Sequence, residues 1–493
     1  MISACAKALS QPTGKAFALF LTDNGFGNPN ENGNGKRLGD LVIESGQVPD
    51  EAERRLLFEV LSAYSGKRVS EFEQRGAELF PGSFCRLNRG LIESADDAPV
   101  FSIVGGDYES AYLETGNCMG VVKIRDADRN IEVQLSIGSR FDQSSRQYFI
   151  NHLLSRVIGG SFVSEVDSGP DSYWEMLLAF LFRKRLLEAS RAGLFRCYQK
   201  ICHDDLRFRG KLDIDLHIRR NIPFIGRLAY TNNEITFDNP LNHLVRHAIR
   251  RVTEKWPYFF IGEKPLTDFY HELERNTPSW QKRKAIACIA ENQRPVKHPY
   301  FHSIYEPIRK LALRILRNEG ITPYSGTDEV EGIIFDGAWL WEQYLWTLLR
   351  PLGYEHPDNK AKSGQWRVLG ETFYPDFFLS KEGQFKVVLD AKYKRGRREQ
   401  RDILQVAGYM QLLGAGIGGL IKPIGDTSSE SFSWGRVPLH DSVWHDISLG
   451  VPPNASSSGQ FVSEIRKSEQ YLTHYIRTMQ GAEKVARGVI NSL

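Results

Sequence analysis

Two aspartates and a lysine stand out as residues that could do chemistry together. Asp390 and Lys392 directly follow an apolar run that ends at Leu389, and Asp376 precedes them on another extended segment. Because residues i and i+2 of a strand point to the same face, we expect Asp390 and Lys392 to lie together, with Asp376 in reach from the neighbouring strand. Charges at the end of buried strands need a reason, because unpaired buried charge is costly.

Phosphodiester hydrolysis supplies such a reason. Asp376, Asp390 and the backbone carbonyl of Ala391 offer the hard oxygen ligands that Mg²⁺ prefers, with Mn²⁺ as an alternative ion. A bound metal lowers the pKa of its water and neutralises charge that develops on the phosphate. Lys392 can then orient or deprotonate the attacking water, or stabilise the pentacoordinate state. The alternative is a surface salt bridge between Asp376 and a lysine, which the buried strand disfavours.

Residues on two predicted helices flank this motif. Glu342 lies in a Trp-rich helix upstream, and Gln405 and Tyr409 share one face of a helix downstream because they are four residues apart. Lys394 belongs to the segment 392–401, which has six basic residues and suits contact with phosphates. Each feature has a plainer alternative: a solvated helix residue for Glu342, a core aromatic for Tyr409 and a solvated loop for 392–401.

Periodicity, capping and turn residues predict the elements that position these residues. In the C-terminal third we expect a helix at 337–350, strands near 365–370, 372–379 and 384–392, a helix at 399–413 and a last helix near 460–491. In the N-terminal third we expect a loop at 24–40, a helix capped by Asp50 and Glu53 and ended by Gly66, a β-hairpin at 120–138 and a helix at 143–158. In the middle we expect a helix capped by Ser172 and Glu175, extended pieces at 207–218 and 224–230, and a helix from Asn239-Pro240.

The composition is that of an ordinary soluble globular protein, with 493 residues, 41% hydrophobic and 25% charged. This length suggests three domains, which we place at 1–165, 166–325 and 326–493. The net charge is only +3 overall, but the middle third has 27 basic and 18 acidic residues and is the candidate for contact with a polyanion. The first and last thirds have net charges of −5 and −1.

Several function classes are disfavoured. Six scattered cysteines, without a C-x-x-C pair, indicate neither a zinc site nor a disulfide framework. The apolar run 176–182 is far shorter than a membrane span, and the N-terminus has no signal pattern, so we expect a cytoplasmic protein. Gly35-Lys36 lacks the other residues of a P-loop, so a nucleoside triphosphate would have to be bound by another chain.

The motifs together resemble the McrC family, the nuclease subunits of McrBC-type modification-dependent (type IV) restriction systems, within the PD-(D/E)xK superfamily. The resemblance is carried by Glu342, the turn 374–376, the segment 389–394 and the spaced residues Asp402, Gln405 and Tyr409. In the middle of the chain, the segments 208–213 and 238–242 are similar to a second family pattern, "RG-hydrophobic-D … D-x-P-x-N".

The resemblance implies a multidomain α+β protein. An N-terminal α+β partner-interaction module and a basic, mainly helical middle domain would precede a C-terminal α/β restriction-endonuclease-like domain. It implies a Mg²⁺-dependent endodeoxyribonuclease of a restriction and anti-phage defence system, with Asp376, Asp390, Lys392 and Glu342 in catalysis and Lys394, Gln405 and Tyr409 in support. The implied partners are modified double-stranded DNA and a McrB-like AAA+ GTPase ring, with no membrane. The alternatives are an adaptor that activates the ring and only binds DNA, and a self-sufficient endonuclease.

Overall fold

The computed structural model describes residues 15–23, 36–37, 50–80, 98–105, 108, 110–126, 129, 131–142, 147–158, 170–257, 259–260, 264–294, 302–316, 330–357, 366–368, 371–395, 399–425, 433–437 and 442–490. Within these ranges, no helix is both long and apolar enough to cross a membrane. Most of the predicted loop 24–40 lies outside them, but Lys36–Arg37 form a short strand rather than a loop.

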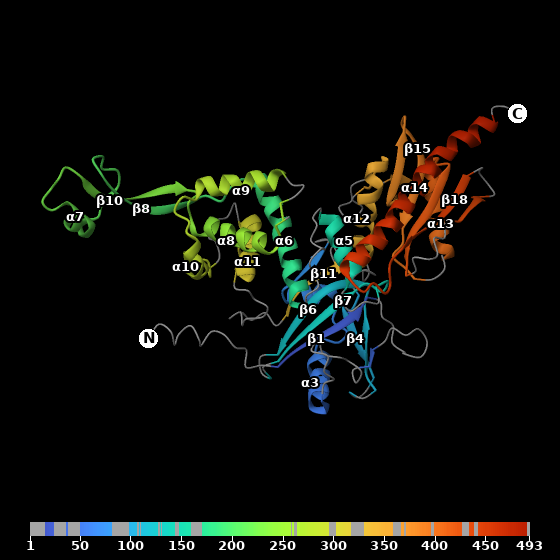
Figure 1. Cartoon of the computed structure of the whole chain (residues 1–493), viewed down its shortest axis with the longest axis horizontal. Helices are drawn as coiled ribbons and strands as arrows, with labels where there is room; N and C mark the ends of the chain where they lie inside the picture. Colours follow the sequence, from blue (N-terminus) through green and yellow to red (C-terminus); the bar gives the residue numbers. More distant parts are fainter. Residues whose placement is uncertain are drawn as a thin grey trace. The chain divides into compact units, whose positions relative to one another are not determined.

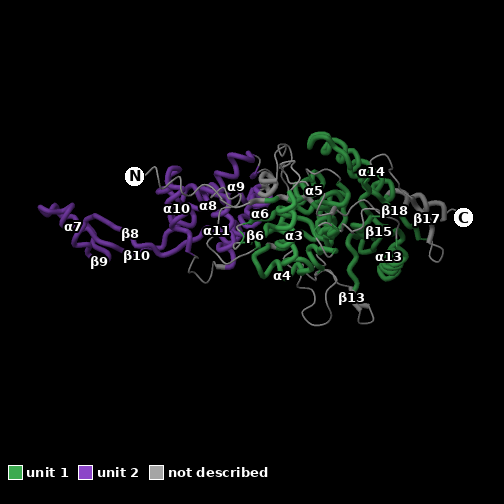
Figure 2. The backbone as a smooth tube through the Cα atoms, turned by 90° about the horizontal axis from the view of Figure 1, so that it is seen from below, with its two compact units in different colours: residues 1–157, 163–170, 324–493 green, residues 158–162, 171–323 purple. Residues whose placement is uncertain are grey.

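The chain forms two compact units (Figure 2). Unit 1 comprises residues 1–157, 163–170 and 324–493, and unit 2 comprises residues 158–162 and 171–323. The molecule is therefore a multidomain α+β protein, in which two distant parts of the chain build one unit.

The first sheet of unit 1 has five strands in the order β1-β7-β6-β11-β3. Its strands are β1 (Lys15–Thr22), β3 (Ala77–Phe80), β6 (Cys118–Asp126), β7 (Ile131–Gly138) and β11 (Val330–Asp336). The predicted hairpin is present as the antiparallel pair β6–β7. A smaller sheet has the order β2-β5-β4, with β2 (Lys36–Arg37), β4 (Phe101–Val104) and β5 (Tyr112–Thr115).

Helices α3 (Glu51–Ser62) and α4 (Val69–Gln74) pack against the first sheet with apolar side chains from one face of each helix. The predicted capping box of α3 is confirmed: the Asp50 side chain accepts from the Glu53 amide at 2.7 Å, and the Glu53 side chain accepts from the Asp50 amide at 3.1 Å. The helix ends four residues before Gly66, which instead forms a turn with φ +73° and donates to the Phe101 carbonyl.

The second sheet of unit 1 has the order β14-β15-β16-β18-β17. Its strands are β14 (Phe377–Lys381), β15 (Gln384–Ala391), β16 (Ile417–Ile424), β17 (Ser433–Val437) and β18 (Ser442–Gly450), and a separate ribbon pairs β12 (Trp366–Val368) with β13 (Glu371–Phe373). The predicted strand 372–379 is thus two strands, interrupted at residues 374–376, where Pro375 has no amide to donate to a ladder. β15, β16 and β18 are parallel to one another.

Four further helices belong to unit 1 in the part of the chain that the structure describes. They are α5 (Tyr148–Ile158), α12 (Gly337–Leu349) with a 3₁₀ turn at Arg350–Leu352, α13 (Gln400–Leu413) and α14 (Ser458–Ile490). Of these, α12, α13 and α14 contact strands of this sheet (Figure 1). The predicted C-terminal helices lie within one or two residues of these bounds. For the predicted helix 143–158, the structure describes a helix from Tyr148 onward.

Unit 2 is mainly helical. Its helices are α6 (Pro170–Ala192), α8 (Pro240–Lys255), α9 (Lys264–Asn276), α10 (Ala285–Glu291) after a 3₁₀ turn at Lys282–Lys284, and α11 (His302–Leu316). Helix α6 begins at Pro170, two residues before the predicted cap at Ser172. Helix α8 begins where predicted, with the Asn239 side chain accepting from the Asn242 amide at 3.0 Å. Because Asn242 also donates to the Phe195 and Phe237 carbonyls, the 238–242 motif has a structural role.

An arm, residues 197–236, extends from these helices and ends near α7 (Figure 1). The antiparallel strands β8 (Cys197–Asp205) and β10 (Leu228–Thr236) build it, with β9 (Lys211–Leu212) and α7 (Ile214–Asn221) at the far end. The extended piece predicted at 207–218 is confirmed only at β9 and is wrong from Ile214 onward, where α7 begins, and of the piece predicted at 224–230 residues 228–230 belong to β10. Asp213 caps α7 by accepting from the Leu216 amide at 3.0 Å, and this local hydrogen bond starts a helix instead of continuing a strand.

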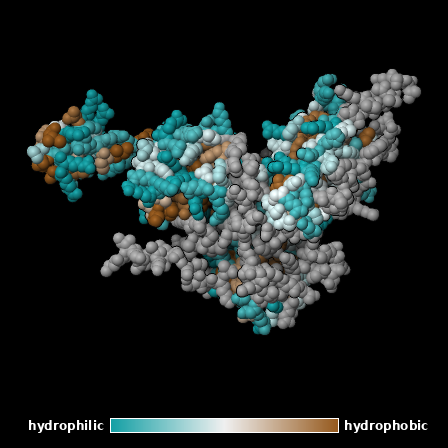
Figure 3. All heavy atoms as spheres, in the orientation of Figure 1, coloured by the Kyte–Doolittle hydropathy of each residue, from teal (hydrophilic) through white to brown (hydrophobic). Residues whose placement is uncertain are grey.

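The arm exposes many large apolar side chains, visible as brown spheres in Figure 3. These side chains are Tyr198, Leu206, Phe208, Leu212, Ile214, Ile218, Ile222, Phe224, Ile225 and Ile235, with exposed fractions from 39% to 75%. Because large exposed apolar patches mark contact surfaces in soluble proteins, the arm is a candidate for one.

We expected residues 1–165 and 326–493 to form separate domains. In the structure both, apart from residues 158–162, belong to unit 1, and β11 lies inside the first sheet. It pairs with β6 on one side and with β3 on the other. The sequence analysis predicted no strand at Val330–Asp336, directly before the Trp-rich helix. Removal of the N-terminal third would therefore disrupt the unit that contains residues 326–493.

A buried carboxylate, Glu469 of α14, connects three helices of unit 1. It lies 2.8 Å from His152 Nε2, pairs with Arg156 of α5 and accepts from the Tyr344 hydroxyl of α12 at 2.9 Å. Burial alone would raise the pKa of Glu469, but the hydrogen bonds and charges of His152 and Arg156 outweigh burial and hold that pKa below its ordinary value.

We predict that Glu469→Gln lowers the free energy of unfolding by about 2–3 kcal/mol at pH 7, because three partners lose a charged acceptor. A carboxylate with a lowered pKa in the folded state stabilises above its ordinary pKa and loses this effect as pH falls through the folded value. The difference between wild type and variant should therefore shrink below about pH 4. Urea denaturation at pH 7 and at pH 3 measures this difference, and an equal difference at both values would contradict the prediction.

Candidate active site

The strand hairpin β14–β15 positions the predicted carboxylates. Its two-residue turn, Glu382-Gly383, has positive φ values of 52° and 75°, the conformation that matches the twist of a tight hairpin. The pairing places Phe377 opposite Leu389, so the residues that follow Leu389 lie beside those that precede Phe377. This register brings Asp376 and Asp390 to the same end of the sheet.

Asp376 is buried and bound to the neighbouring strand. Its Oδ2 atom accepts a hydrogen bond of 2.8 Å from the Ala391 amide. Its own carbonyl accepts from Nδ1 of His356 at 2.6 Å. These two contacts fix both the side chain and the backbone of Asp376.

Asp390 and Lys392 lie together, as their spacing predicts. The Lys392 Nζ atom is 2.6 Å from Asp390 Oδ2, and only 2% of the Asp390 side chain is exposed. Lys392 Nζ also donates to Gln405 Oε1 at 3.1 Å, and its amide donates to the Ile421 carbonyl at 2.9 Å. The second contact continues the β15–β16 ladder by one residue, so the lysine is held at both ends.

Burial dominates the electrostatics of the site. It raises the pKa of Asp376 to about 7, and the charge of Glu342 adds to this effect. Burial likewise raises the pKa of Asp390 well above its ordinary value, with Asp376 as the next cause. Burial alone would lower the pKa of Lys392, but the attraction of Asp390 and Asp376 outweighs it and raises that pKa. Lys392 is therefore an ammonium at neutral pH.

The flanking residues predicted from the sequence differ in how directly they interact with Asp376, Asp390 and Lys392. Glu342, on α12, acts on Asp376 through its charge. Gln405 joins Lys392 to Tyr409, whose hydroxyl accepts from Gln405 Nε2 at 2.9 Å. Tyr409 is 6% exposed and packs on Phe378 and Val388, so it is a core aromatic that also supports the site.

Lys394 is half-exposed and pairs with carboxylates of α13. Its Nζ atom is 3.1 Å from Glu399 and 3.4 Å from Asp402. A phosphate would therefore have to compete with these partners. DNA contact by Lys394 stays a prediction.

The donor set at this site fits a hard divalent cation. Two buried carboxylates with raised pKa values form a place where a positive charge would be stabilised, and carboxylate oxygens are the ligands that Mg²⁺ prefers. Across the described residues, no group of three or more His, Cys, Asp or Glu side chains is arranged as a complete metal site. Asp376, Asp390 and a backbone carbonyl such as that of Ala391 would thus need water as additional ligands.

Sequence reasoning missed His356. Besides its bond to the Asp376 carbonyl, its Nε2 atom lies 3.0 Å from Gln343 Nε2, and its ring packs on Phe377. Gln343 is the neighbour of Glu342, so His356 connects α12 with the strand end that carries Asp376. No spacing rule could have found it, because it lies 20 residues upstream in an irregular segment.

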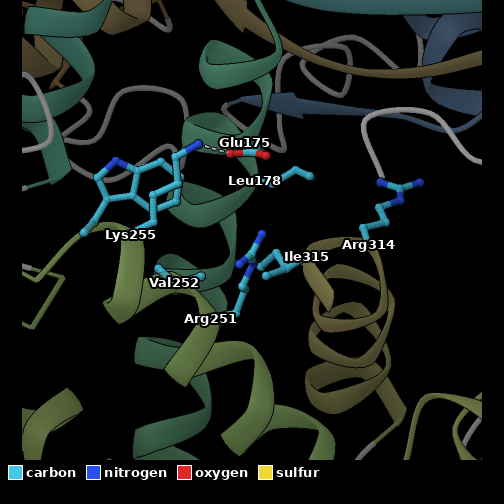
Figure 4. A pocket seen from close by; sticks show the side chains of 8 residues that line it. Glu175, Leu178, Arg251, Val252, Lys255, Arg314 and Ile315 are labelled. Carbon is cyan, nitrogen blue, oxygen red and sulfur yellow. Dashed lines mark hydrogen bonds and ion pairs between the residues drawn. The ribbon is translucent and has the colours of Figure 1, made fainter. Parts of the chain in front are cut away.

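A pocket in unit 2 has a different character (Figure 4). Its lining comes from α6, α8 and α11 and includes three basic side chains, Arg251, Lys255 and Arg314. Lys255 forms an ion pair with Glu175. None of the lining residues belongs to the Asp376–Asp390–Lys392 cluster, and contact of the middle third with a polyanion stays a prediction.

Comparisons with known proteins give one family and two solved structures. A family model described as McrBC 5-methylcytosine restriction system component matches residues 113–423. A chain of the refined half-complex from the tetradecameric assembly of Thermococcus gammatolerans McrB AAA+ hexamers with bound McrC is 14% identical, with a TM-score of 0.46, covering 92% of this chain and 100% of that chain. A chain of the cryo-EM structure of the Thermococcus gammatolerans McrBC complex is 16% identical, with a TM-score of 0.28, covering 68% of this chain and 87% of that chain. No curated protein matches.

The raised pKa of Asp376 predicts an unusual stability change. Between about pH 4 and pH 7 the unfolded chain loses the Asp376 proton while the folded state keeps it, so the metal-free protein loses stability as pH rises through this range. Asp376→Asn keeps the acceptor for the Ala391 amide and should be more stable than wild type at pH 8, by about 2–4 kcal/mol. Denaturation with EDTA at pH 4 and pH 8 measures the difference.

A matched control is Asp402→Asn, which removes a buried carboxylate that pairs with Lys394 and should not stabilise. Added Mg²⁺ at pH 8 should stabilise wild type and leave Asp376→Asn nearly unchanged, because a ligand that binds only the folded state raises stability. If Asp376→Asn were less stable than wild type at pH 8, the ionised Asp376 carboxylate would not destabilise the folded protein, which contradicts the prediction.

Proposed function

Since the chain belongs to the family of McrBC 5-methylcytosine restriction system components, we propose that it is the DNA-cleaving subunit of such a system, a metal-dependent endodeoxyribonuclease. One observation carries the proposal: Asp376, Asp390 and Lys392 converge at one end of the second sheet, where β14 begins and its antiparallel neighbour β15 ends, in the sequence pattern P-D…D-x-K. This pattern supports a PD-(D/E)xK fold for the part of unit 1 that contains α12, the second sheet and α13. The parallel neighbours β15, β16 and β18 and the helices α12 and α13 agree with it.

Asp376 and Asp390 would hold Mg²⁺ or Mn²⁺, with the Ala391 carbonyl and water as further ligands. When bound, the ion lowers the pKa of a coordinated water and neutralises charge on the phosphate. In this proposal Glu342 would accept a hydrogen bond from a water near Asp376. Its negative charge already acts on that carboxylate.

Lys392 acts as a positive charge in this proposal. Its raised pKa keeps the ammonium protonated, which favours stabilising the pentacoordinate phosphate or orienting the attacking water over accepting a proton. Gln405 holds the ammonium from the other side, and Tyr409 holds Gln405. The pair Gln405–Tyr409 thus limits the positions that Lys392 can adopt.

The substrate that we propose is modified double-stranded DNA. Six basic residues lie within 392–401, directly after Asp390 and Ala391 in the sequence, and the middle third has nine more basic than acidic residues. Phosphate contacts of this kind position a duplex without reading its sequence. Recognition of the modified base is therefore assigned to the partner.

The partner that we propose is a McrB-like AAA+ GTPase ring, because the sequence has no P-loop of its own. Two surfaces are candidates for the contact. One is the acidic N-terminal segment expected from the sequence. The other is the apolar arm of unit 2, whose exposed side chains include Ile222, Phe224 and Ile225 at 63–65%. The arm is the stronger candidate, since large exposed apolar patches mark contact surfaces.

We predict that Lys392→Ala slows DNA cleavage by several orders of magnitude with DNA binding nearly unchanged, because it removes charge stabilisation of the transition state. Asp390→Ala should abolish Mg²⁺-dependent cleavage. Single-turnover cleavage of methylated DNA with the partner measures the rates, and Lys386→Ala on the same strand is the matched control.

A loss confined to DNA binding would make Lys392 a phosphate contact and leave Glu342 as the next residue to test. Wild-type cleavage by Asp390→Ala would contradict the metal site. If wild type stimulates its partner but never cuts, the chain is an adaptor. Nucleotide-independent cutting without a partner would favour a self-sufficient endonuclease.

For the partner contact, we predict that the isolated chain hydrolyses no GTP and raises hydrolysis by the AAA+ ring severalfold. Phe224→Ser/Ile225→Ser should abolish this increase, because it removes exposed apolar area from the arm. The comparison variant is Glu51→Lys/Glu59→Lys on α3, which reverses the charge of the N-terminal surface. Loss of stimulation only in the α3 variant would assign the contact to the N-terminal segment.

A further inference from the structure

Tyr393 directly follows Lys392 and points the opposite way. Successive residues of an extended chain alternate between faces, so Lys392 faces Asp390 while Tyr393 enters the body of unit 1. The Tyr393 side chain is 4% exposed, and burial raises the pKa of its hydroxyl well above the ordinary value. Tyr393 is thus a neutral phenol, fixed one residue away from the lysine.

The end of the first sheet forms a socket for this ring, built by Ser139, Arg140 and Phe141. The Ser139 and Tyr393 hydroxyl oxygens are 2.6 Å apart, the Arg140 guanidinium carbon is 4.9 Å from the ring centre, and Phe141 packs edge-on at 5.2 Å. These three residues follow β7 directly. They belong to a different sheet from β15 and lie about 250 residues earlier in the chain.

The socket is rigid because Arg140 is itself fixed. Asp23, which has no exposed surface, accepts from Arg140 Nε at 3.1 Å, from its Nη2 at 2.7 Å and from its amide at 2.6 Å. Separating either partner would leave an unpaired buried charge. Asp23 in turn donates its amide to the Gly138 carbonyl, so the ends of β1 and β7 are joined at this point.

Helix α12 closes the other side of the socket through Gly337 and Trp341. The Trp341 ring centre is 6.4 Å from that of Tyr393. A Cβ atom on Gly337 would lie 3.1 Å from Tyr393 Cε1, tighter than an ordinary contact. The ring therefore has little freedom, and neither does the backbone that carries it.

We propose that Tyr393 is a positioning residue, held by Ser139 and Arg140 of the first sheet so that the Lys392 ammonium stays between Asp390 and Gln405. This inference rests on the proposed function of Lys392. The first sheet then belongs to the cleavage machinery although it supplies no ligand to metal or DNA. A displacement of the β7 end would move the ammonium, and small misplacements of a catalytic group cost large factors in rate.

The experiment compares Tyr393→Phe, Ser139→Ala and the double variant in the full chain with its partner. Each single variant removes the same hydrogen bond, so each should slow single-turnover cleavage about tenfold at saturating Mg²⁺. The double variant should be about as slow as either single one. DNA affinity should not change. Tyr305→Phe, which removes a buried hydroxyl contact to the Gly193 carbonyl in unit 2, should lower the melting temperature without slowing cleavage.

A second readout does not depend on cleavage. Amide hydrogen exchange in the peptide 389–395 should accelerate severalfold in Tyr393→Phe and Ser139→Ala but not in Tyr305→Phe. Unchanged exchange, or wild-type cleavage rates in both single variants, would overturn the positioning role. Faster exchange in a chain whose wild type does not cut DNA would keep the positioning role and reject the proposed nuclease function.

Discussion

Two carboxylates withdrawn from water beside each other are the constraint on which unit 1 is built. Asp376 and Asp390 repel each other, lose hydration and share one ammonium, so the cluster is short of positive charge. A fold keeps such a group only if its surroundings leave no alternative geometry. Three features fix the geometry here: the β14–β15 register, the hydrogen bond from the Ala391 amide to the Asp376 side chain, and the hydrogen bond from His356 to the Asp376 carbonyl.

The same constraint explains why so much of unit 1 is directed at one strand end. Helix α12 contributes Glu342 on one side and the Trp341 wall on another, and α14 fixes α12 through Tyr344 and Glu469. The first sheet reaches the strand end through the residues after β7. Unit 1 is therefore one frame around a charged centre, rather than a nuclease domain with a separate module attached.

The sequence predicted what depends on nearby residues. The capping box at Asp50, the proline start of α8 and the i, i+2 pair Asp390–Lys392 each need fewer than five residues of context, and the structure contains all three. Contacts between residues far apart in the sequence could not be predicted. Nothing in the spacing of His356, Tyr393 or Val330 reveals a partner 20 to more than 200 residues away. At Asp213, a helix cap overrode an alternation that favours a strand.

The place of β11 in the first sheet also sets an order for biosynthesis. β6 gains one neighbour, β7, almost at once, but its other neighbour begins at Val330, after all of unit 2 has left the ribosome. At ordinary rates of translation this delay is roughly ten to forty seconds. During it the nascent chain presents the open edge of an apolar strand, a template for wrong pairing.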